Sequence, residues 1–181
     1  EGKLVQMRHI SGLNFRVSHA VTGCAEPLFR QICPERPSSL LLAGAVGSGK
    51  TTMLRDLCRL LGASWRLTLV DERSEIAAVH HGVPQYDVGL HTDVLDGFPR
   101  AEGLLTALRV LVCDEISTEA DAQAILRIHG SGVPVVASAH GTSLEDLERR
   151  PALKQLLDKG VFRYAAVLSG REQGKVQTLR R

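Results

Sequence analysis

The chain has 181 residues, of which 44% are hydrophobic, and its formal net charge is +2. This length and composition predict one domain with a sizeable core, and the near balance of basic and acidic residues argues against a disordered chain or a strongly basic nucleic-acid-binding protein. No apolar run approaches the ~18–20 residues that a membrane-spanning helix needs, so we expect a soluble chain.

The N-terminal part carries little information on fold. The chain begins at Glu1 rather than at methionine and opens without a secretory leader, so we expect it to be trimmed at this end. Apolar and polar residues alternate over 3–17, which predicts either a pair of strands or the remnant of a preceding domain. We therefore assign 1–20 to a remnant or linker and 21–181 to the main domain. The four cysteines match neither a redox pair nor a zinc site, which favours free thiols and a cytoplasmic location.

The first α/β unit is predicted at 39–61. Residues 39–43 form an apolar run typical of a buried strand, and a glycine-rich turn follows it. Within 50–61, leucine and methionine side chains recur every three or four residues, as on the buried face of a helix that Gly62 closes. The predicted order is strand, loop, helix.

Three further apolar runs, at 66–71, 109–114 and 133–138, predict strands of a parallel sheet. Residues 82–98 show no period and are rich in Gly, Pro and Asp, so we expect a long loop there. A helix is predicted from Pro99 to about residue 108, and it meets the next strand with almost no connection.

Capping signals place two more helices. Thr118 followed by Asp121 predicts a capping box that opens a helix ending at Gly130. Thr142 followed by Glu145 predicts the start of another.

The C-terminal runs 161–168 and 175–179 predict an antiparallel hairpin. Together with the alternating strands and helices before them, they predict an α/β domain with a largely parallel central sheet, flanking helices and antiparallel C-terminal strands. Polar residues end several parallel strands, at the edge where such sheets bind ligands.

The glycine-rich segment after the first strand fits G-x-x-x-x-G-K-T, the pattern of a phosphate-binding loop (P-loop). In such a loop the backbone N–H groups and the helix N-terminus bind phosphate, Lys50 reaches the outer phosphates and the Thr51 hydroxyl ligates magnesium. Its position between a strand and a helix disfavours a purely structural turn. The predicted nucleotide-binding residues are Gly44, Ala45, Val46, Gly47, Ser48, Gly49, Lys50, Thr51 and Thr52.

An acidic pair, Asp114 and Glu115, ends the strand predicted at 109–114. We predict that Asp114 holds magnesium together with Thr51, partly through water, and that Glu115 polarises the attacking water. The pair alone would be typical of a solvated surface. With a P-loop upstream, it predicts hydrolysis of a nucleoside triphosphate.

Two further strand ends enter the candidate site. Asp71, Glu72 and Arg73 follow the second predicted strand, and His140 follows the fourth. A surface acid or a lone histidine is usually structural, but these residues are predicted at the sheet edge that carries the P-loop.

The order of these motifs resembles that of the hexameric ATPases of type II and type IV secretion and of pilus motors. Longer blocks resemble the stage III sporulation AA family of endospore-forming bacteria over about residues 9–168, among them VDERSEIA, GVPQYDVGLHTDVLDGFPRAEG, DEIST and AHGTSLEDLERRPALKQLL. The resemblance implies a RecA-like core that uses ATP and Mg²⁺, and an N-terminal domain that this chain largely lacks.

The same resemblance implies partners and a location. We expect a homo-oligomer, a hexamer when full-length, docked on a membrane protein of the transport complex between mother cell and forespore. The chain would then lie in the cytoplasm on the mother-cell side, without nucleic acid.

By position, the resemblance makes Asp71 and Glu72 an acidic box, Glu115 the catalytic carboxylate and His140 a sensor of the γ-phosphate. His91 stands where this family has an arginine, and histidine is a weaker electrostatic stabiliser. The candidates for an arginine that acts across subunits are then Arg73 and Arg100. The predicted catalytic residues are Glu115, Glu72, His140, Arg73 and Arg100.

Two alternatives to an ATPase that energises transport stay open. A protein that binds single-stranded nucleic acid under control of ATP could use the same core, but only 4% of the residues are aromatic and the basic residues are dispersed. A ring that binds nucleotide without turnover would also carry these motifs, because Glu115 acts only when correctly placed.

Overall fold

The computed structural model describes residues 12, 19–104, 109–169 and 174–180. The predicted strand pair at 3–17 lies outside the described residues, apart from Gly12. The described strands are β1 (Leu40–Gly44), β2 (Leu67–Asp71), β3 (Thr92–Asp96), β4 (Val110–Cys113), β5 (Val135–His140), β6 (Tyr164–Leu168) and β7 (Val176–Arg180). The described helices are α1 (Glu26–Ile32), α2 (Lys50–Gly62), α3 (Arg100–Leu104), α4 (Glu119–Gly130), α5 (Leu144–Glu148) and α6 (Pro151–Asp158).

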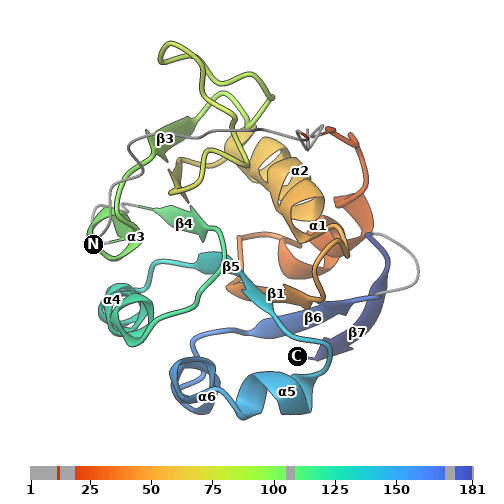
Figure 1. Cartoon of the computed structure of the whole chain (residues 1–181), viewed down its shortest axis with the longest axis vertical. Helices are drawn as coiled ribbons and strands as arrows, with labels where there is room; N and C mark the ends of the chain where they lie inside the picture. The colour runs from red at the N-terminus through yellow and green to blue at the C-terminus, as the bar shows by residue number, and fades with distance from the viewer. Residues whose placement is uncertain (1–11, 13–18, 105–108, 170–173, 181) are drawn as a thin grey trace.

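The strands form one sheet in the order β3-β2-β4-β5-β1-β6-β7. Neighbouring strands are parallel except β6 and β7, which pair antiparallel (Figure 1). The predicted fold class is therefore confirmed. None of the described helices combines the length and apolar character of a membrane span.

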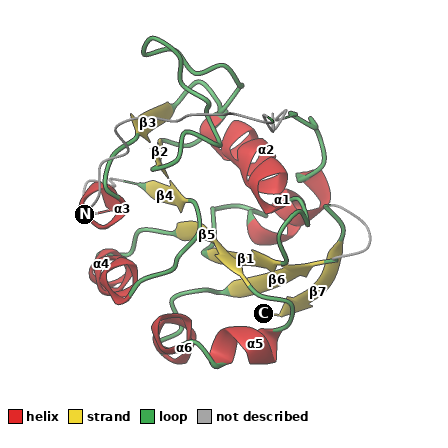
Figure 2. Ribbon diagram, viewed as in Figure 1, coloured by secondary structure: helices red, strands yellow, loops and turns green. Residues whose placement is uncertain are grey.

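Helices cover both faces of the sheet and create two hydrophobic cores (Figure 2). Helices α1 and α2 pack on one face, and α3 to α6 pack on the other. Successive strand residues point to opposite faces, so Leu40 and Leu42 of β1 enter the first core while Leu41 and Ala43 enter the second. Burial on both faces explains why these strands are continuous apolar runs.

Three elements differ from the sequence prediction, and one of them is helix α6, which was not predicted. Helix α1 has only seven residues, too few to display a helical period, and it was not predicted. Strand β3 lies inside the segment predicted as a loop, so that prediction is wrong for Thr92–Asp96. β3 is an edge strand that is only partly buried, and it therefore lacks the continuous apolar run of the central strands. Of the helix predicted from Pro99, the described part is Arg100–Leu104.

The capping predictions have two outcomes. Thr118 and Asp121 form the predicted capping box at the start of α4. Helix α5 begins one residue later than predicted, because its N-cap is Ser143, whose hydroxyl accepts a hydrogen bond from the Asp146 N–H at 3.2 Å. The backbone N–H of Thr142 instead donates to the Asp146 carboxylate at 3.1 Å.

The C-terminal end of α2 touches the segment before β3 backbone to backbone. The carbonyl of Gly62 accepts a hydrogen bond from the His91 N–H at 2.8 Å. Gly89 has a φ of +90°, and a β-carbon there would lie 2.5 Å from the carbonyl carbon of Gly62. Only glycine permits this approach, so the pair fixes where α2 lies against the edge of the sheet.

Candidate nucleotide-binding site

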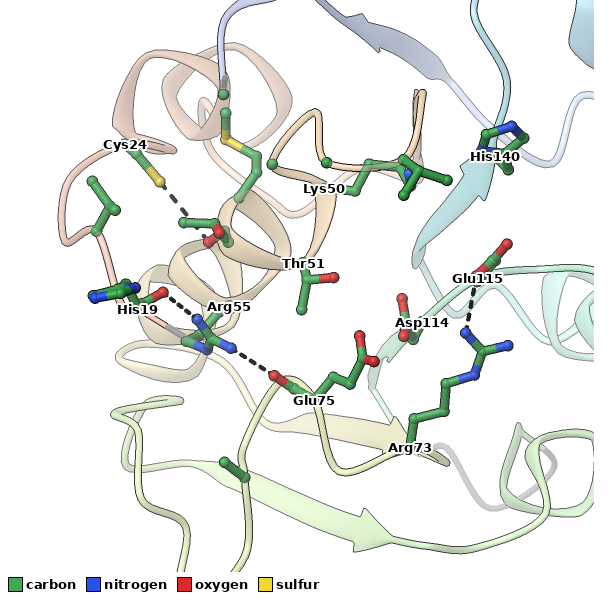
Figure 3. Close-up of a pocket in the computed structure, with 18 of the residues that line it drawn as sticks. His19, Cys24, Lys50, Thr51, Arg55, Arg73, Glu75, Asp114, Glu115 and His140 are labelled. Carbon is green, nitrogen blue, oxygen red and sulfur yellow. Dashed lines mark hydrogen bonds and ion pairs between the residues drawn. The ribbon is translucent and has the colours of Figure 1, made fainter. Parts of the chain in front are cut away.

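A pocket of about 890 Å³ lies beside the N-terminus of α2, at the carboxyl edge of the sheet (Figure 3). It is lined by the P-loop, by the segment after β2, by the ends of β4 and β5, and by the segment before α1. The structure brings together in it ten of the predicted site residues, namely Val46, Gly47, Gly49, Lys50, Thr51, Thr52, Arg73, Asp114, Glu115 and His140.

The P-loop connects the end of β1 to the start of α2. Gly47 and Gly49 have φ values of +76° and +94°, a left-handed conformation that glycine adopts without strain. Within the described structure no side chain caps the N-terminus of α2. The first N–H groups of this helix are therefore available to an anion in the pocket.

Lys50 lies across its own loop. Its Nζ donates to the carbonyls of Gly44 and Ala45, each at 2.9 Å. Burial lowers the pKa of Lys50, while the carboxylates of Glu115 and Asp114 act in the opposite direction. The ammonium group is thus held at the loop, close to carboxylates that favour its charge.

The hydroxyl of Ser48 is a buried polar atom without a hydrogen-bond partner among the described residues. Such groups are rare in folded proteins, and each calls for an explanation. An oxyanion held by the loop would provide an acceptor. The loop therefore fits a phosphate-bearing ligand by its backbone, its lysine and this hydroxyl.

Three oxygen-bearing side chains face one part of the pocket, those of Thr51, Asp114 and Glu75 (Figure 3). Asp114 is 5% exposed, and its Oδ1 accepts a hydrogen bond from the Ser138 hydroxyl at 3.0 Å. Oxygen ligands suit Mg²⁺, which commonly takes one or two carboxylates together with substrate phosphates. Among the described residues no group of three His, Cys, Asp or Glu side chains is placed to hold a metal ion. The donor set fits magnesium that is shared with a phosphate.

Glu115 and His140 lie at the same end of the pocket, on the ends of β4 and β5 (Figure 3). The guanidinium of Arg73 contacts the Glu115 carboxylate at 3.4 Å, and both side chains are partly exposed. Glu115 is therefore oriented by a cation that can still reach solvent.

Arg100 does not line the pocket, and its side chain is only 5% exposed. It donates to the carboxylates of Glu72 at 2.6 Å and Asp121 at 3.2 Å, and to the backbone carbonyl of Glu115. Arg100 is thus held by acids of its own chain, whereas the side chain of Arg73 is 56% exposed. Of the two arginines predicted to act across subunits, Arg73 is the more accessible.

The two residues of the predicted acidic box, Asp71 and Glu72, lie in different environments. Asp71 is fully buried and accepts hydrogen bonds at 2.8–2.9 Å from the N–H groups of residues 75–77, so it closes a turn. Burial raises the pKa of Asp71, and these hydrogen bonds oppose the shift. Glu72 is bound by Arg100 and does not line the pocket.

The acid that enters the pocket from this segment is Glu75, which the sequence analysis missed. The only available signal was a third acid in the same short block. Between Asp71 and Glu75 the chain turns through Ser74, whose φ of 54° is left-handed. No local sequence pattern predicts this turn. The turn determines which carboxylate faces the nucleotide site.

A second cavity, of about 490 Å³, adjoins the pocket between α1 and β7. The two share Cys24, Met53 and Gly174. The N–H of Gly174 donates to the carbonyl of Ser48 at 2.9 Å, so the end of the β6–β7 hairpin rests on the P-loop. Cys24 and Glu115 lie at opposite ends of the pocket, with Thr51 between them (Figure 3).

A P-loop between a buried strand and a helix, with two carboxylates at the end of a nearby parallel strand, defines a P-loop NTPase fold. The chain is similar in structure to the VirB11 ATPase of the Brucella suis type IV secretion system, solved in complex with sulphate. The TM-score is 0.61 at 19% identity, over 84% of this chain and 50% of that one.

The chain belongs to the family described as sporulation stage III, protein AA, whose model matches residues 1–180. The resemblance predicted from the sequence is thus confirmed. The chain is 38% identical over 190 residues to stage III sporulation protein AA of Bacillus subtilis (strain 168), covering 98% of this chain and 62% of that protein. It is 32% identical over 160 residues to the protein SEEDLING PLASTID DEVELOPMENT 1 of Arabidopsis thaliana. That match covers 82% of this chain and 22% of the plant protein. The chain therefore spans less than two thirds of either relative.

Proposed function

We propose that the chain binds ATP with Mg²⁺ and hydrolyses it. The observation that carries the proposal is that Lys50, Thr51, Asp114 and Glu115 line one pocket at the N-terminus of an uncapped helix. These are the groups that bind phosphate, hold magnesium and orient water in nucleotide hydrolysis.

Each residue has a separate task in this proposal. Lys50 exchanges its two loop carbonyls for phosphate oxygens, which are stronger acceptors for an ammonium group. Thr51, Asp114 and Glu75 would hold a magnesium ion, which would neutralise charge on the phosphates. Glu115 accepts a hydrogen bond from the attacking water and polarises it.

Arg73 and His140 act at the γ-phosphate end of the pocket. Arg73 contacts and orients Glu115, and it is exposed enough to be drawn to a phosphate or a neighbouring subunit. His140, at the end of the strand between β4 and β1, lines the pocket and would respond to the γ-phosphate. The nucleoside would then extend in the other direction, toward Cys24 and Met53 and the adjoining cavity.

For the whole protein we propose a homo-oligomer, a hexamer when full-length, that energises a secretion-like transport complex between mother cell and forespore. It would work in the cytoplasm against a membrane protein of that complex, without nucleic acid. Residues 1–20 would lead to a further domain, and 21–181 would be the ATPase domain. The family and the VirB11-like fold support this proposal.

The decisive measurement is Mg²⁺-dependent ATP hydrolysis across protein concentration, with light scattering to report mass. Turnover per subunit should rise with assembly. Glu115→Gln should bind ATP and lose hydrolysis, whereas Lys50→Ala should lose binding. Equal loss of binding in both variants would contradict the role of Glu115. Tight binding without turnover by the unaltered chain would favour a nucleotide-binding scaffold.

A further inference from the structure

Arg55 is a buried cation to which the proposed hydrolysis assigns no role. It lies on α2, is 2% exposed, and places its guanidinium carbon 4.0 Å from the ring centroid of Tyr86. Its Nε, Nη2 and Nη1 donate to three backbone carbonyls, at 2.8, 2.6 and 2.6 Å, those of Ile76, Glu75 and His19. Burying a charge is costly unless such contacts compensate it, so this arrangement calls for a reason.

The three carbonyls belong to segments that are separate in the sequence and meet at the pocket (Figure 3). One segment precedes α1 and the other is the turn after β2, while Arg55 itself belongs to the helix that the P-loop opens. Arg55 therefore ties the phosphate-binding helix to two walls of the same pocket. Its donors are directed at these carbonyls, so it acts through other residues rather than on a phosphate.

The backbone of Glu75 is held from both sides. Its N–H donates to the Asp71 carboxylate at 2.9 Å, and its carbonyl accepts from Arg55 at 2.6 Å. The preceding residue, Ser74, is in a left-handed conformation that costs free energy and persists only where neighbouring contacts hold it. Because both peptide groups of Glu75 are fixed, its side chain is directed into the pocket beside Asp114.

We propose that Arg55 is a positioning residue that sets Glu75 relative to the P-loop helix, so that Glu75 can share the magnesium ion of a bound nucleotide. The inference rests on the proposed nucleotide binding. The guanidinium reaches the three carbonyls from three separate nitrogens held in one plane, whereas lysine has a single nitrogen from which all of its N–H donors must reach. Arg55→Lys therefore keeps the charge and loses the geometry.

The test measures the dissociation constant of a fluorescent ATP analogue with Mg²⁺ and with a chelator. The unaltered chain should bind more tightly with Mg²⁺, and Glu75→Gln should lose about tenfold of that gain, as is typical when support of a metal site is removed. Arg55→Lys should lose a similar part of the gain in affinity that Mg²⁺ provides. Its affinity measured with the chelator should stay within about twofold of that of the unaltered chain. The double variant should match Glu75→Gln alone, because both act through one carboxylate.

Arg59→Lys is the matched control. Arg59 lies one turn further along α2 and pairs with Asp56 at 2.7 Å, and it does not line the pocket. This variant should keep the full Mg²⁺ gain. Circular dichroism and thermal unfolding verify that each variant folds.

An unchanged Mg²⁺ gain in folded Arg55→Lys, or a further loss in the double variant, would overturn the inference alone. If the unaltered chain binds no nucleotide, the proposed function fails and the inference fails with it. If Arg55→Lys does not fold, Tyr86→Leu replaces it. That variant removes the ring and should cost about two- to fivefold of the Mg²⁺ gain, and no loss there would also overturn the inference.

Discussion

The carboxylate of Glu72 lies 2.6 Å from the guanidinium of Arg100, and neither residue lines the nucleotide-binding pocket. Arg100 also donates to the backbone carbonyl of Glu115. The pair therefore links the end of β2 to the end of β4 from outside the pocket. Through Arg100, Glu72 supports the backbone that carries the proposed catalytic carboxylate.

This arrangement predicts different effects for two glutamates of one turn. Glu75→Gln should lower Mg²⁺-dependent turnover by about tenfold or more, because a carboxylate leaves the metal-binding part of the pocket. Glu72→Gln should lower it by less than about fivefold, since glutamine still accepts a hydrogen bond from Arg100. Steady-state hydrolysis with titrated Mg²⁺ distinguishes them, and the reverse ranking would contradict the assignment.

Arg100→Met should destabilise the fold by about 3–5 kcal/mol, because it leaves the buried carboxylate of Asp121 without its cation. Denaturant unfolding measures this loss. Arg73→Met is the control, since the exposed Arg73 should contribute less than about 1 kcal/mol to stability while its loss lowers turnover. Wild-type stability of Arg100→Met, with turnover restored by mixing it with Glu115→Gln, would instead support action across subunits.

Asp71→Asn should cost about 1–3 kcal/mol of stability, because an amide group has one oxygen with which to serve three N–H donors. Asp93→Asn, at an exposed position of β3, is the matched control and should leave the free energy of unfolding unchanged. Urea titration of both variants tests the difference. Equal stability of the two would show that Asp71 does not close the turn.

The thiol of Cys24 should react slowly despite lining the pocket. Burial, assisted by the nearby Asp56 carboxylate, raises its pKa to about 11. At pH 8 only about 0.1% would be thiolate, the reactive form, and this fraction should rise as the pH approaches the pKa. Alkylation followed by mass spectrometry at pH 8 to 10, with Cys24→Ser to assign the product, should show that rise. A rate already constant at pH 8 would exclude the raised pKa.

The parts of the fold that were predicted correctly depend on local signals. The P-loop, the helix after it and the capping box of Thr118 and Asp121 each need only a few neighbouring residues. The central strands are continuous apolar runs because both of their faces are covered. Strand β3 has no such run, since it lies at the sheet edge, and α1 is too short for a period to emerge.

The fine arrangement of the site could not be predicted in the same way. Asp71, Glu72 and Glu75 lie within five residues, and the sequence does not distinguish them chemically. The position of each carboxylate depends on the left-handed conformation of Ser74, on the burial of Asp71 and on the ion pair of Glu72 with Arg100. Arg100 belongs to α3, which is far from this turn in the sequence. These are tertiary relationships, and the same is true of Arg55, which resembles any other arginine on an amphipathic helix.

The contact between Gly62 and Gly89 couples the position of the whole of α2 to the backbone packing at its C-terminal end. The helix has 13 residues and is therefore about 20 Å long, with the glycine contact at one end and Lys50 at the other. A methyl group at Gly89 would lie 2.5 Å from the backbone of Gly62, so we expect the helix to shift or tilt to relieve the clash. Misplacement of a phosphate-binding group by ~1 Å can cost about a hundredfold in rate. A change remote from every proposed catalytic residue would thus act on the chemistry through the rigidity of a single helix.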